Sequence, residues 1–321
     1  MILRSVATLA TTALTLAAWP WHGNGHEQVA DIAWLNLTAK SKSEVAEILK
    51  AGDADFVPAN DDEKSVRAAF RRASTWADWV KEHKDGRFED GITAWNERFQ
   101  PGYDPNDPDK EAHRCRRWHY FDVPLNAKKG EAGVNGANAL IAYVTGTYEL
   151  AILSRQTPQD RSTECWWLYW LTHIVGDLHQ PLHCVSDHRY EASGDAGGNL
   201  FKLGEAYPDN PNKMMNLHSI WDGGIGHAIE AEAGKPTDVE SVSERWLKEF
   251  APTEEAANNL EVGQWISDGA KLAQSVVYDG ISRDGKQSDD YKARRLDVCR
   301  RQAVLAGVRL GKVLNFLLDH Q

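Results

Sequence analysis

The chain has 321 residues, of which 42% are hydrophobic and 26% are charged, and its formal net charge is −11. This length and composition fit one large globular domain or two small ones. The acidic balance excludes a bulk-electrostatic nucleic-acid binder, so any phosphate ligand must be held by local positive charge, and bound cations are one source of it.

The first residues have the form of a secretory signal peptide. Arg4 precedes an apolar run that ends in small residues at Ala18. We expect cleavage after residue 18 or residue 20, and we assign residues 21–321 to a single domain. No later stretch is long and apolar enough to span a membrane. The protein is therefore expected to be secreted or periplasmic, without a membrane anchor.

Four cysteines suit such a compartment and allow up to two disulfide bonds. They are Cys115, Cys165, Cys184 and Cys299. Their spacing contains no Cys-x-x-Cys pair, which disfavours a zinc finger or a thioredoxin-like site. The sequence does not determine the pairing.

Helical periodicity recurs along most of the mature chain. Helices are expected from His26 onward and over 42–50, 65–83, 138–155, 161–180, 218–222, 238–250, 254–276 and 289–318. Turn-forming and polar residues predict irregular segments over 53–63, 86–117, 130–136 and 184–215. No β-alternation persists, so the chain is predicted to be all-α, with long loops gathered near its histidines and aspartates.

The segment from His173 to His183 concentrates three histidines and one aspartate within eleven residues. His173 and Asp177 are four residues apart, so on a helix they project from the same face. Pro181 disfavours helix at the preceding residue, so the helix should end near Gln180. His183 then lies just beyond the break and can turn back toward the same point.

The same spacing recurs at His218 and Asp222. Solvated pairs on a helix face are the alternative interpretation. The neighbouring tryptophans favour a core instead; they are Trp166, Trp167, Trp170 and Trp221. Buried ionisable groups need partners, and a metal ion satisfies several imidazoles and carboxylates at once.

Three further candidates are weak when taken singly. Asp78, between two tryptophans, is typical of a structural hydrogen-bonding residue. His119 is typical of a core histidine, and Lys81 of a solvated lysine. Taken with the pairs above, the candidates form one set of imidazole and carboxylate ligands: His26, Asp78, His119, His173, Asp177, His183, His218 and Asp222.

This set exceeds the needs of one tetrahedral zinc and contains no thiolate. It suits two or three zinc ions, with Asp177 able to bridge. Zinc ions about 3.5–4 Å apart can clamp the oxygens of an in-line displacement at phosphorus. The residues alone therefore predict a secreted, helical, multinuclear zinc phosphoesterase.

Several motifs occur in a fixed order along the chain. They are Trp21-x-Gly-x-Gly-His26, Trp76-Ala-Asp78, His119-Tyr-x-Asp122, the His173–His183 segment, Gly-Gly-Asn199 and Asn216-Leu-His218-x-x-Trp-Asp222. Together they resemble the secreted single-strand-specific zinc nucleases of the S1/P1 family, which share their fold with bacterial phospholipase C. The resemblance spans nearly the whole mature chain. It implies a single multi-helix domain with long loops around a zinc cluster.

The resemblance implies three zinc ions per chain. The ligands of one ion would be Asp78, His119, His173 and the bridging Asp177. Those of the second would be His183, His218 and Asp222. Those of the third would be His26, Asp177, and the free amine and carbonyl of Trp21.

The resemblance also implies roles in catalysis and substrate binding. A zinc-activated water would attack phosphorus in line, Asp78 would act as a ligand in the catalytic group, and Lys81 would stabilise charge on the phosphoryl oxygens. The substrates would be single-stranded DNA and RNA, cleaved to 5′-phosphorylated products. Activity on 3′-nucleotides stays open.

A base-binding pocket follows from the same resemblance. Tyr120 would stack on a nucleobase and Asp122 would hydrogen-bond its edge, while Gly197 and Asn199 would complete the pocket. Such a pocket needs an unstacked base, which accounts for a preference for single strands.

The chain departs from the family pattern at four places. The base stacker is Tyr120, where the family often has Phe. The segment 264–269 lacks the family's usual Trp-Ala-x-Glu-Ser form. The loop before Asn199 is long. Pro20 disfavours direct cleavage before Trp21, so we hypothesise a second trimming step that removes residues 19–20.

Two other classes of protein share part of this pattern. A zinc-dependent phospholipase C would keep the scaffold and most ligands but lack the pocket of Tyr120 and Asp122. A non-enzymatic periplasmic zinc-binding protein would need neither that pocket nor Lys81.

Overall fold

The computed structural model describes residues 23–79, 117–128, 138–208 and 210–319, and the following statements concern these residues. The N-terminal part contains α1 (Gly23–Asn36), α2 (Ala39–Leu49), α3 (Glu63–Ala73) and α4 (Trp76–Trp79). The middle part contains η1 (Arg117–His119), β1 (Val123–Leu125), α7 (Ala139–Leu153), α8 (Arg161–Asp177), η2 (Pro181–Cys184) and β2 (Val185–Asp187). The C-terminal part contains β3 (Lys202–Tyr207), β4 (Asn210–Asn216), α9 (Leu217–Asp222), α10 (Gly224–Glu230), α11 (Val239–Glu249), α12 (Glu254–Asn258), α13 (Val262–Leu272), η3 (Ala273–Val277) and α14 (Asp289–Leu318).

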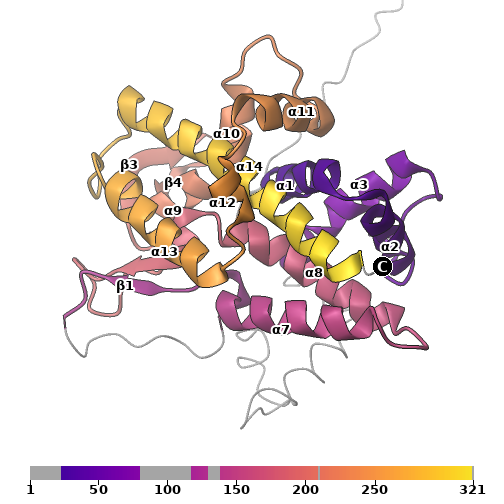
Figure 1. The fold of residues 1–321 in the computed structure, drawn as a ribbon. Coiled ribbons are helices and arrows are strands. Elements are labelled where there is room, and N and C mark those ends of the chain that lie inside the picture. The colour runs from indigo at the N-terminus through magenta and orange to yellow at the C-terminus, as the bar shows by residue number, and fades with distance from the viewer. Residues whose placement is uncertain (1–22, 80–116, 129–137, 209, 320–321) are drawn as a thin grey trace, which may run out of the picture.

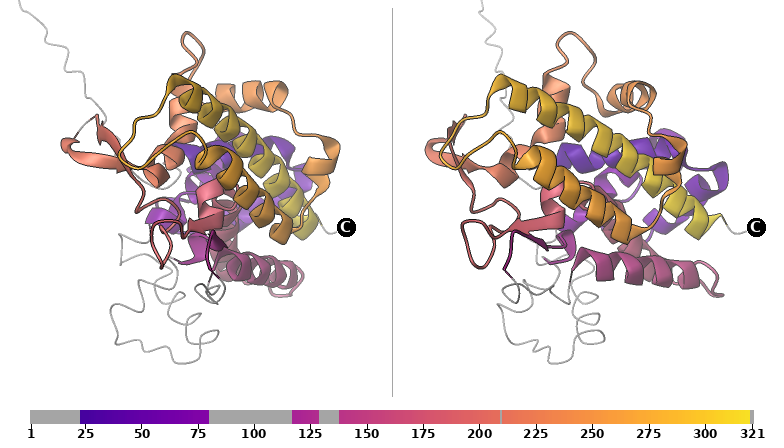
Figure 2. Two further views of the ribbon diagram at one scale, coloured as in Figure 1. Left: turned by 90° about the vertical axis from the view of Figure 1, so that its left-hand side faces the viewer. Right: turned by 60° about the vertical axis from the view of Figure 1, so that its left-hand side comes forward.

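Helix α8 is the centre of the bundle. Every residue from Glu164 to Asp177 is buried, because α7, α1, α2, α4 and α14 all pack against this helix. Figures 1 and 2 show α7 along one edge, and Figure 1 shows α14 running diagonally in front of α8. Its tryptophans also contact η1, where the Trp118 ring lies 4.9 Å from that of Trp170. The predicted aromatic core is therefore built around the helix that begins the His173–His183 segment.

Helices α1 and α14 meet with their backbones close together. A Cβ atom added to Gly307 would lie 2.5 Å from the Ile32 side chain, and one added to Gly311 would lie 2.7 Å from Asn36 Cβ. The two glycines are four residues apart and so share one face of α14. Asn315 closes the contact by donating to the Asn36 carbonyl at 2.9 Å. This packing fixes α1, which carries His26.

Side-chain caps set most helix starts. In each case the side chain accepts a hydrogen bond from the backbone N–H three residues on, the usual N-cap arrangement. The capping residues include Thr38, Asp62, Asn138, Asp160, Asp238, Thr253 and Ser288. The prediction of a mainly helical fold is confirmed. Across the described ranges, no helix has the length and apolarity needed to cross a membrane.

The structure corrects the prediction of a continuous loop over 184–215. Strand β2 pairs in parallel with β1, and β3 pairs with β4 as an antiparallel hairpin that continues into α9. The hairpin side chains are mostly exposed or half-buried on both faces. Because neither face is buried, the hairpin sequence has no alternation of apolar and polar residues.

Two predicted helices are divided. The helix expected over 65–83 ends at Ala73, and α4 begins at Trp76, because Ser74 and Thr75 bond their hydroxyls back to preceding carbonyls. The helix expected over 254–276 breaks at 259–261, where the Asn259 side chain accepts from the backbone of Glu261. Helix α8 ends at residue 177, three before Gln180, and α10 was not predicted.

The expectation of up to two disulfide bonds is wrong for the described cysteines. No disulfide joins Cys165, Cys184 or Cys299, and all three are buried. They are separated in the core: Cys165 packs by Gly52, Cys184 by α13 and Cys299 by α10. Cys115, the signal peptide and the predicted irregular segments 86–117 and 130–136 lie outside the described residues, except for Arg117 at the start of η1.

Candidate metal centre

The described ligand candidates converge from separate elements of the fold. They are His26 on α1, Asp78 on α4, His119 on η1, His173 and Asp177 on α8, His183 on η2, and His218 and Asp222 on α9. All are buried except His218, which is half-buried. The structure thus brings together every predicted ligand that it describes. Trp21 and Lys81 lie outside the described residues.

Asp177 lies at the centre of this cluster. Its Oδ2 is 2.9 Å from His119 Nδ1 and 3.0 Å from His173 Nε2, and its Oδ1 is 3.1 Å from His183 Nδ1 and 3.5 Å from His26 Nε2. Burial opposes the charged form, but the charges of His173 and His183 and hydrogen bonds from His119 and His173 hold the pKa of this carboxyl well below its usual range. Asp177 therefore stays a carboxylate with one oxygen directed to each side of the cluster.

The ligand atoms form three overlapping groups, each within 4.8 Å. The groups are His26 with His173 and Asp177; Asp78 with His119 and His173; and His183 with His218 and Asp222. In the last group, Asp222 lies 3.4 Å from His183 Nε2 and 3.1 Å from His218 Nε2. In the second, Asp78 lies 3.8 Å from both His119 Nδ1 and His173 Nε2. Each group offers nitrogen and oxygen ligands of the kind that zinc accepts.

Backbone carbonyls orient three of the imidazoles. The Nδ1 atoms of His173, His183 and His218 lie 2.7, 2.8 and 2.7 Å from the carbonyl oxygens of Ser74, His119 and Gly197. A carbonyl only accepts, so each Nδ1 carries the proton and donates. Each Nε2 is therefore directed into the cluster, where it can bind a metal once it has no proton, and this is how proteins prepare a histidine for a metal.

A metal ion fits the polar atoms that the protein leaves unsatisfied here. Both ring nitrogens of His26, Oδ1 of Asp177 and Nε2 of His183 are buried without a hydrogen-bond partner. Burial and the neighbouring charge of His173 lower the pKa of His26, so its ring is neutral. Leaving such a group unpaired costs about 1–3 kcal/mol. Cations bound in the groups of His26 and His183 would satisfy the lone pairs among these atoms.

Tyr120 and Asp122 lie beside the group that contains His183. The Phe121 N–H donates to the His183 carbonyl at 2.8 Å, and β1 and β2 run in parallel from that point, with Val123 opposite Val185. Burial raises the pKa of the Asp122 carboxyl to about 6. The two predicted base-binding residues therefore adjoin the cluster, with Tyr120 half-buried.

Gly197 and Asn199 lie in a turn that packs against the start of α9, where the His218 N–H donates to the Gly198 carbonyl at 3.3 Å. Gly197 has φ +60°, and a Cβ there would lie 2.5 Å from the Leu182 carbonyl oxygen, so the turn requires glycine. Its own carbonyl accepts from His218. Asn199 is exposed and donates its amide to the Ala196 carbonyl at 2.9 Å. The turn thus positions the His218 imidazole and leaves Asn199 at the surface beside it.

Two positioning residues were not identified from the sequence. Gln180 donates to Asp222 Oδ1 at 2.7 Å and accepts from the backbone of Leu182 at 2.6 Å. Gln180 lies inside the His173–His183 segment, and this position was the only sign in the sequence of a role near the cluster. Ser74 acts through its carbonyl on His173 and leaves no signal in the sequence.

His179, the remaining histidine of the His173–His183 segment, has a different environment. Its Nδ1 donates to the Val175 carbonyl at 2.7 Å, and its Nε2 accepts from Arg309 at 2.9 Å. Burial, with the charge of Arg309, lowers the pKa of His179 to about 3. Its exclusion from the predicted ligands agrees with the three groups above.

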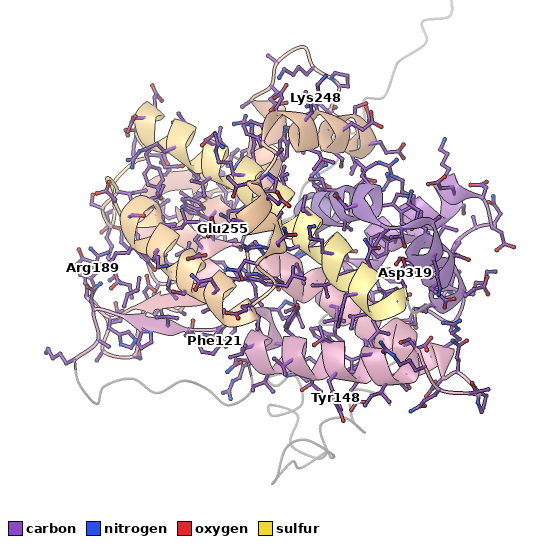
Figure 3. The ribbon with its side chains drawn as sticks, in the orientation of Figure 1. Phe121, Tyr148, Arg189, Lys248, Glu255 and Asp319 are labelled. Carbon is purple, nitrogen blue, oxygen red and sulfur yellow. The ribbon has the colours of Figure 1, made fainter. Side chains whose placement is uncertain are left out.

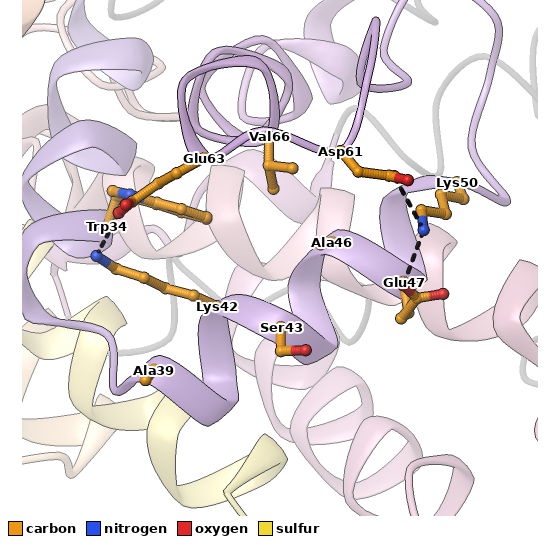
Figure 4. Close-up of a pocket in the computed structure, with 10 residues that line it drawn as sticks. All are labelled: Trp34, Ala39, Lys42, Ser43, Ala46, Glu47, Lys50, Asp61, Glu63 and Val66. Carbon is orange, nitrogen blue, oxygen red and sulfur yellow. Dashed lines mark hydrogen bonds and ion pairs between the residues drawn. The ribbon is translucent and has the colours of Figure 1, made fainter.

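A separate cavity of about 590 Å³ lies between α1, α2 and α3 (Figure 4). Its charged side chains pair with one another: Lys42 with Glu63 at 2.9 Å, and Lys50 with Glu47 at 2.8 Å and Asp61 at 3.0 Å. No histidine lines it. The cavity therefore lacks the chemistry found in the cluster around Asp177.

The chain is similar in sequence to several known proteins. The family model described as S1/P1 Nuclease matches residues 21–319. Endonuclease 2 of Arabidopsis thaliana is 25% identical over 92% of this chain and 89% of its own length. Endonuclease 4 of the same plant is 24% identical over 96% and 92%. Nuclease S1 of Aspergillus oryzae is 29% identical over 68% and 58%.

Proposed function

Because the chain belongs to the S1/P1 nuclease family and is therefore a nuclease that hydrolyses phosphodiester bonds, we propose that it is zinc-dependent and acts on single-stranded DNA and RNA. The products would carry 5′-phosphates. The observation that carries the proposal is the set of buried, unsatisfied ligand atoms around Asp177. The family assignment favours this activity over a phospholipase C and over a non-enzymatic zinc-binding protein.

We assign three zinc ions to the three groups of ligands. The first would be held by Asp78, His119, His173 and Asp177, the second by His183, His218 and Asp222, and the third by His26, Asp177 and Trp21. When bound, zinc supplies Lewis-acid polarisation of the phosphoryl oxygens and activates water as a nucleophile. The low pKa of Asp177 supports a bridging role, because the carboxylate stays ionised near neutral pH.

The chain's own residues would orient the substrate. Tyr120 would stack on one nucleobase, and Asp122 would accept hydrogen bonds from its edge, beside the group that contains His183. Gly197 and Asn199 would form the rim of this pocket. Lys81 would neutralise charge on the phosphoryl oxygens during the displacement.

We also propose that the protein is secreted or periplasmic. The form of residues 1–20 supports this, and the third zinc requires that Trp21 be the first residue of the mature chain. We therefore propose that residues 19–20 are trimmed after signal cleavage. Active, fully zinc-loaded protein should show an intact mass that begins at Trp21, whereas a mass beginning at Trp19 would refute the trimming.

The decisive assay offers single-stranded DNA, duplex DNA, RNA and phosphatidylcholine to the purified mature protein, with and without a chelator. We expect cleavage of the single strands to 5′-phosphorylated products, loss of cleavage on chelation and recovery with zinc. Elemental analysis should give three zinc ions per chain. Cleavage of the phospholipid alone would reject the pocket of Tyr120 and Asp122, and full activity after chelation would reject zinc dependence.

A further inference from the structure

Helix α9 carries two of the three ligands of one metal group, His218 and Asp222, on only six residues. A helix this short has little stability of its own, so contacts with the rest of the fold decide where it lies. Its first turn is held by the preceding loop, because the Leu217 N–H donates to the Phe201 carbonyl at 2.9 Å. Its last turn needs a second support.

Two buried side chains of α14 supply that support. Tyr291 accepts a hydrogen bond from Trp221 Nε1 at 2.9 Å, and its hydroxyl donates to the Val277 carbonyl at 2.7 Å. Arg295 Nη1 donates to the Ile220 carbonyl. Tyr291 and Arg295 are four residues apart and so share one face of α14. Both of their contacts on α9 lie between its two metal ligands in the sequence.

The bond from Arg295 reaches a backbone group at the end of α9. The last carbonyls of a helix have no partner within it, so they need donors from outside. Helix α10 begins at Gly224, directly after the residue that ends α9 is followed by a single linking residue. Arg295 also contacts α10, since its Nη1 lies 3.2 Å from His227 Nδ1. One guanidinium thus joins α14 to both short helices.

Arg295 is a buried charge without a counter-charge close by. Its exposed fraction is 5%, and within the described ranges it bonds to a carbonyl and an imidazole but to no carboxylate. Its Nε has no hydrogen-bond partner there. Burial lowers the pKa of Arg295, although an arginine stays charged at neutral pH. A charge buried in this way opposes folding, which points to a role beyond packing.

We propose that Arg295, assisted by Tyr291, is a positioning residue for the metal ligands of α9. The pair holds the last turn of this helix so that His218 Nε2 and Asp222 Oδ2, 3.1 Å apart, face His183 before an ion binds. Preformed ligands lose less conformational entropy on binding, so their affinity for the ion is higher. The inference rests on the proposed function and deepens it, because it assigns the affinity of one zinc to side chains that are not ligands.

The same helix contains a matched control, Arg309. It is also buried, with 3% exposed, and it also bonds to a carbonyl and an imidazole, those of Ala256 and His179. It lies about 21 Å further along the helix. Figure 3 shows Glu255 on α12, the helix that Arg309 reaches at Ala256, and Asp319 beyond the end of α14. Replacing Arg309 therefore removes a buried guanidinium without removing support from α9.

The test titrates the mature, zinc-loaded protein with a chelator and counts the ions released. For Arg295→Met, which keeps an unbranched side chain but no charge, we expect one of the three zinc ions to bind about tenfold more weakly and the other two to bind as in the wild type. Arg309→Met should release all three as the wild type does, although both variants should unfold at a lower urea concentration. Arg295→Lys keeps a charged donor for the Ile220 carbonyl and should restore most of the affinity.

Two further variants make the test specific. Tyr291→Phe removes one hydroxyl and keeps the ring, so it should weaken one ion by a smaller factor, and it carries the test if Arg295→Met does not fold. In a His218→Ala background, where the ion held by α9 is already lost, Arg295→Met should not weaken the remaining ions.

The positioning role is refuted if neither Arg295→Met nor Tyr291→Phe weakens one zinc selectively, if all three ions weaken equally, or if Arg309→Met gives the same selective loss. A failure of the proposed function looks different, because the wild type would then bind no zinc or would cleave no single strand.

Discussion

Histidines of one short segment have opposite environments. Both ring nitrogens of His179 are bonded by protein, to the Val175 carbonyl and to Arg309. His183, four residues on, bonds only Nδ1 to a carbonyl, and its buried Nε2 has no hydrogen-bond partner. His173 likewise donates Nδ1 to a carbonyl and turns Nε2 toward Asp177. The difference separates a structural histidine from one prepared for a metal.

The positively charged neighbour of His179 explains its role. Arg309 is buried, stacks 5.2 Å from the Trp265 ring and donates to the Ala256 carbonyl at 3.1 Å. A neutral His179 gives this guanidinium another acceptor, and burial lowers the pKa of Arg309 to about 10. One side of the segment is thus satisfied by protein alone, and the other leaves lone pairs for cations. We therefore expect substitutions near Asp177 to lower the zinc content, and substitutions near His179 to lower the stability without loss of zinc.

The largest effect is expected for Asp177→Asn. The amide cannot supply the charge that faces four histidines, so zinc content should fall and kcat/KM should drop on the order of a thousandfold. Elemental analysis and initial rates measure both. Asp53→Asn is the matched control, because Asp53 is buried and accepts from Trp76 at 2.6 Å, a role that an amide oxygen keeps. Normal zinc content in Asp177→Asn would contradict the bridging role.

A smaller effect, on stability alone, is expected for His179→Ala. Removing the acceptor leaves a buried Arg309 donor unsatisfied, so the free energy of unfolding should fall by about 2–3 kcal/mol. Urea unfolding of the zinc-loaded protein measures this loss. His179→Gln keeps an acceptor oxygen and should lose less. Zinc content and activity well below the melting temperature should match the wild type in both variants, and a loss of zinc would break the distinction.

The smallest effect is expected for Gln180→Ala. Gln180 lies between the two regions and orients Asp222 through a 2.7 Å hydrogen bond. Losing such support lowers metal affinity about tenfold to a hundredfold, and we expect the lower end because His183 and His218 stay in place. Competition with a zinc chelator measures the affinity. Gln264→Ala removes a similar 2.8 Å bond to Asp268 on α13 and should leave it unchanged.

Much of the fold follows from local pattern. The 289–318 helix, the two helices that flank residues 154–160 and the short helix near residue 45 all appear because apolar spacing and caps agree there. Hairpin β3–β4 escaped prediction because it buries neither face. The breaks at Ser74 and Asn259 depend on side-chain hydrogen bonds to nearby backbone, which hydrophobic periodicity does not detect.

The residues of the cluster could be predicted from the sequence only in part. The four-residue spacings of His173 with Asp177 and of His218 with Asp222 identify candidate ligands directly. His26 and Asp78 could be added only because the same chemistry recurred elsewhere in the chain. The carbonyl of Ser74 could not be predicted at all, since a backbone group has no signature in residue identity.

The packing of α1 on α14 determines when during synthesis this enzyme can become active. A chain made from its N-terminus cannot complete the group with His183 until Asp222 has emerged. The helix that carries His26 finds its main packing partner only with Gly307 and Gly311, close to the end of translation. Ribosome-bound intermediates therefore lack the finished cluster, so nuclease activity can begin only after nearly the whole chain has been made.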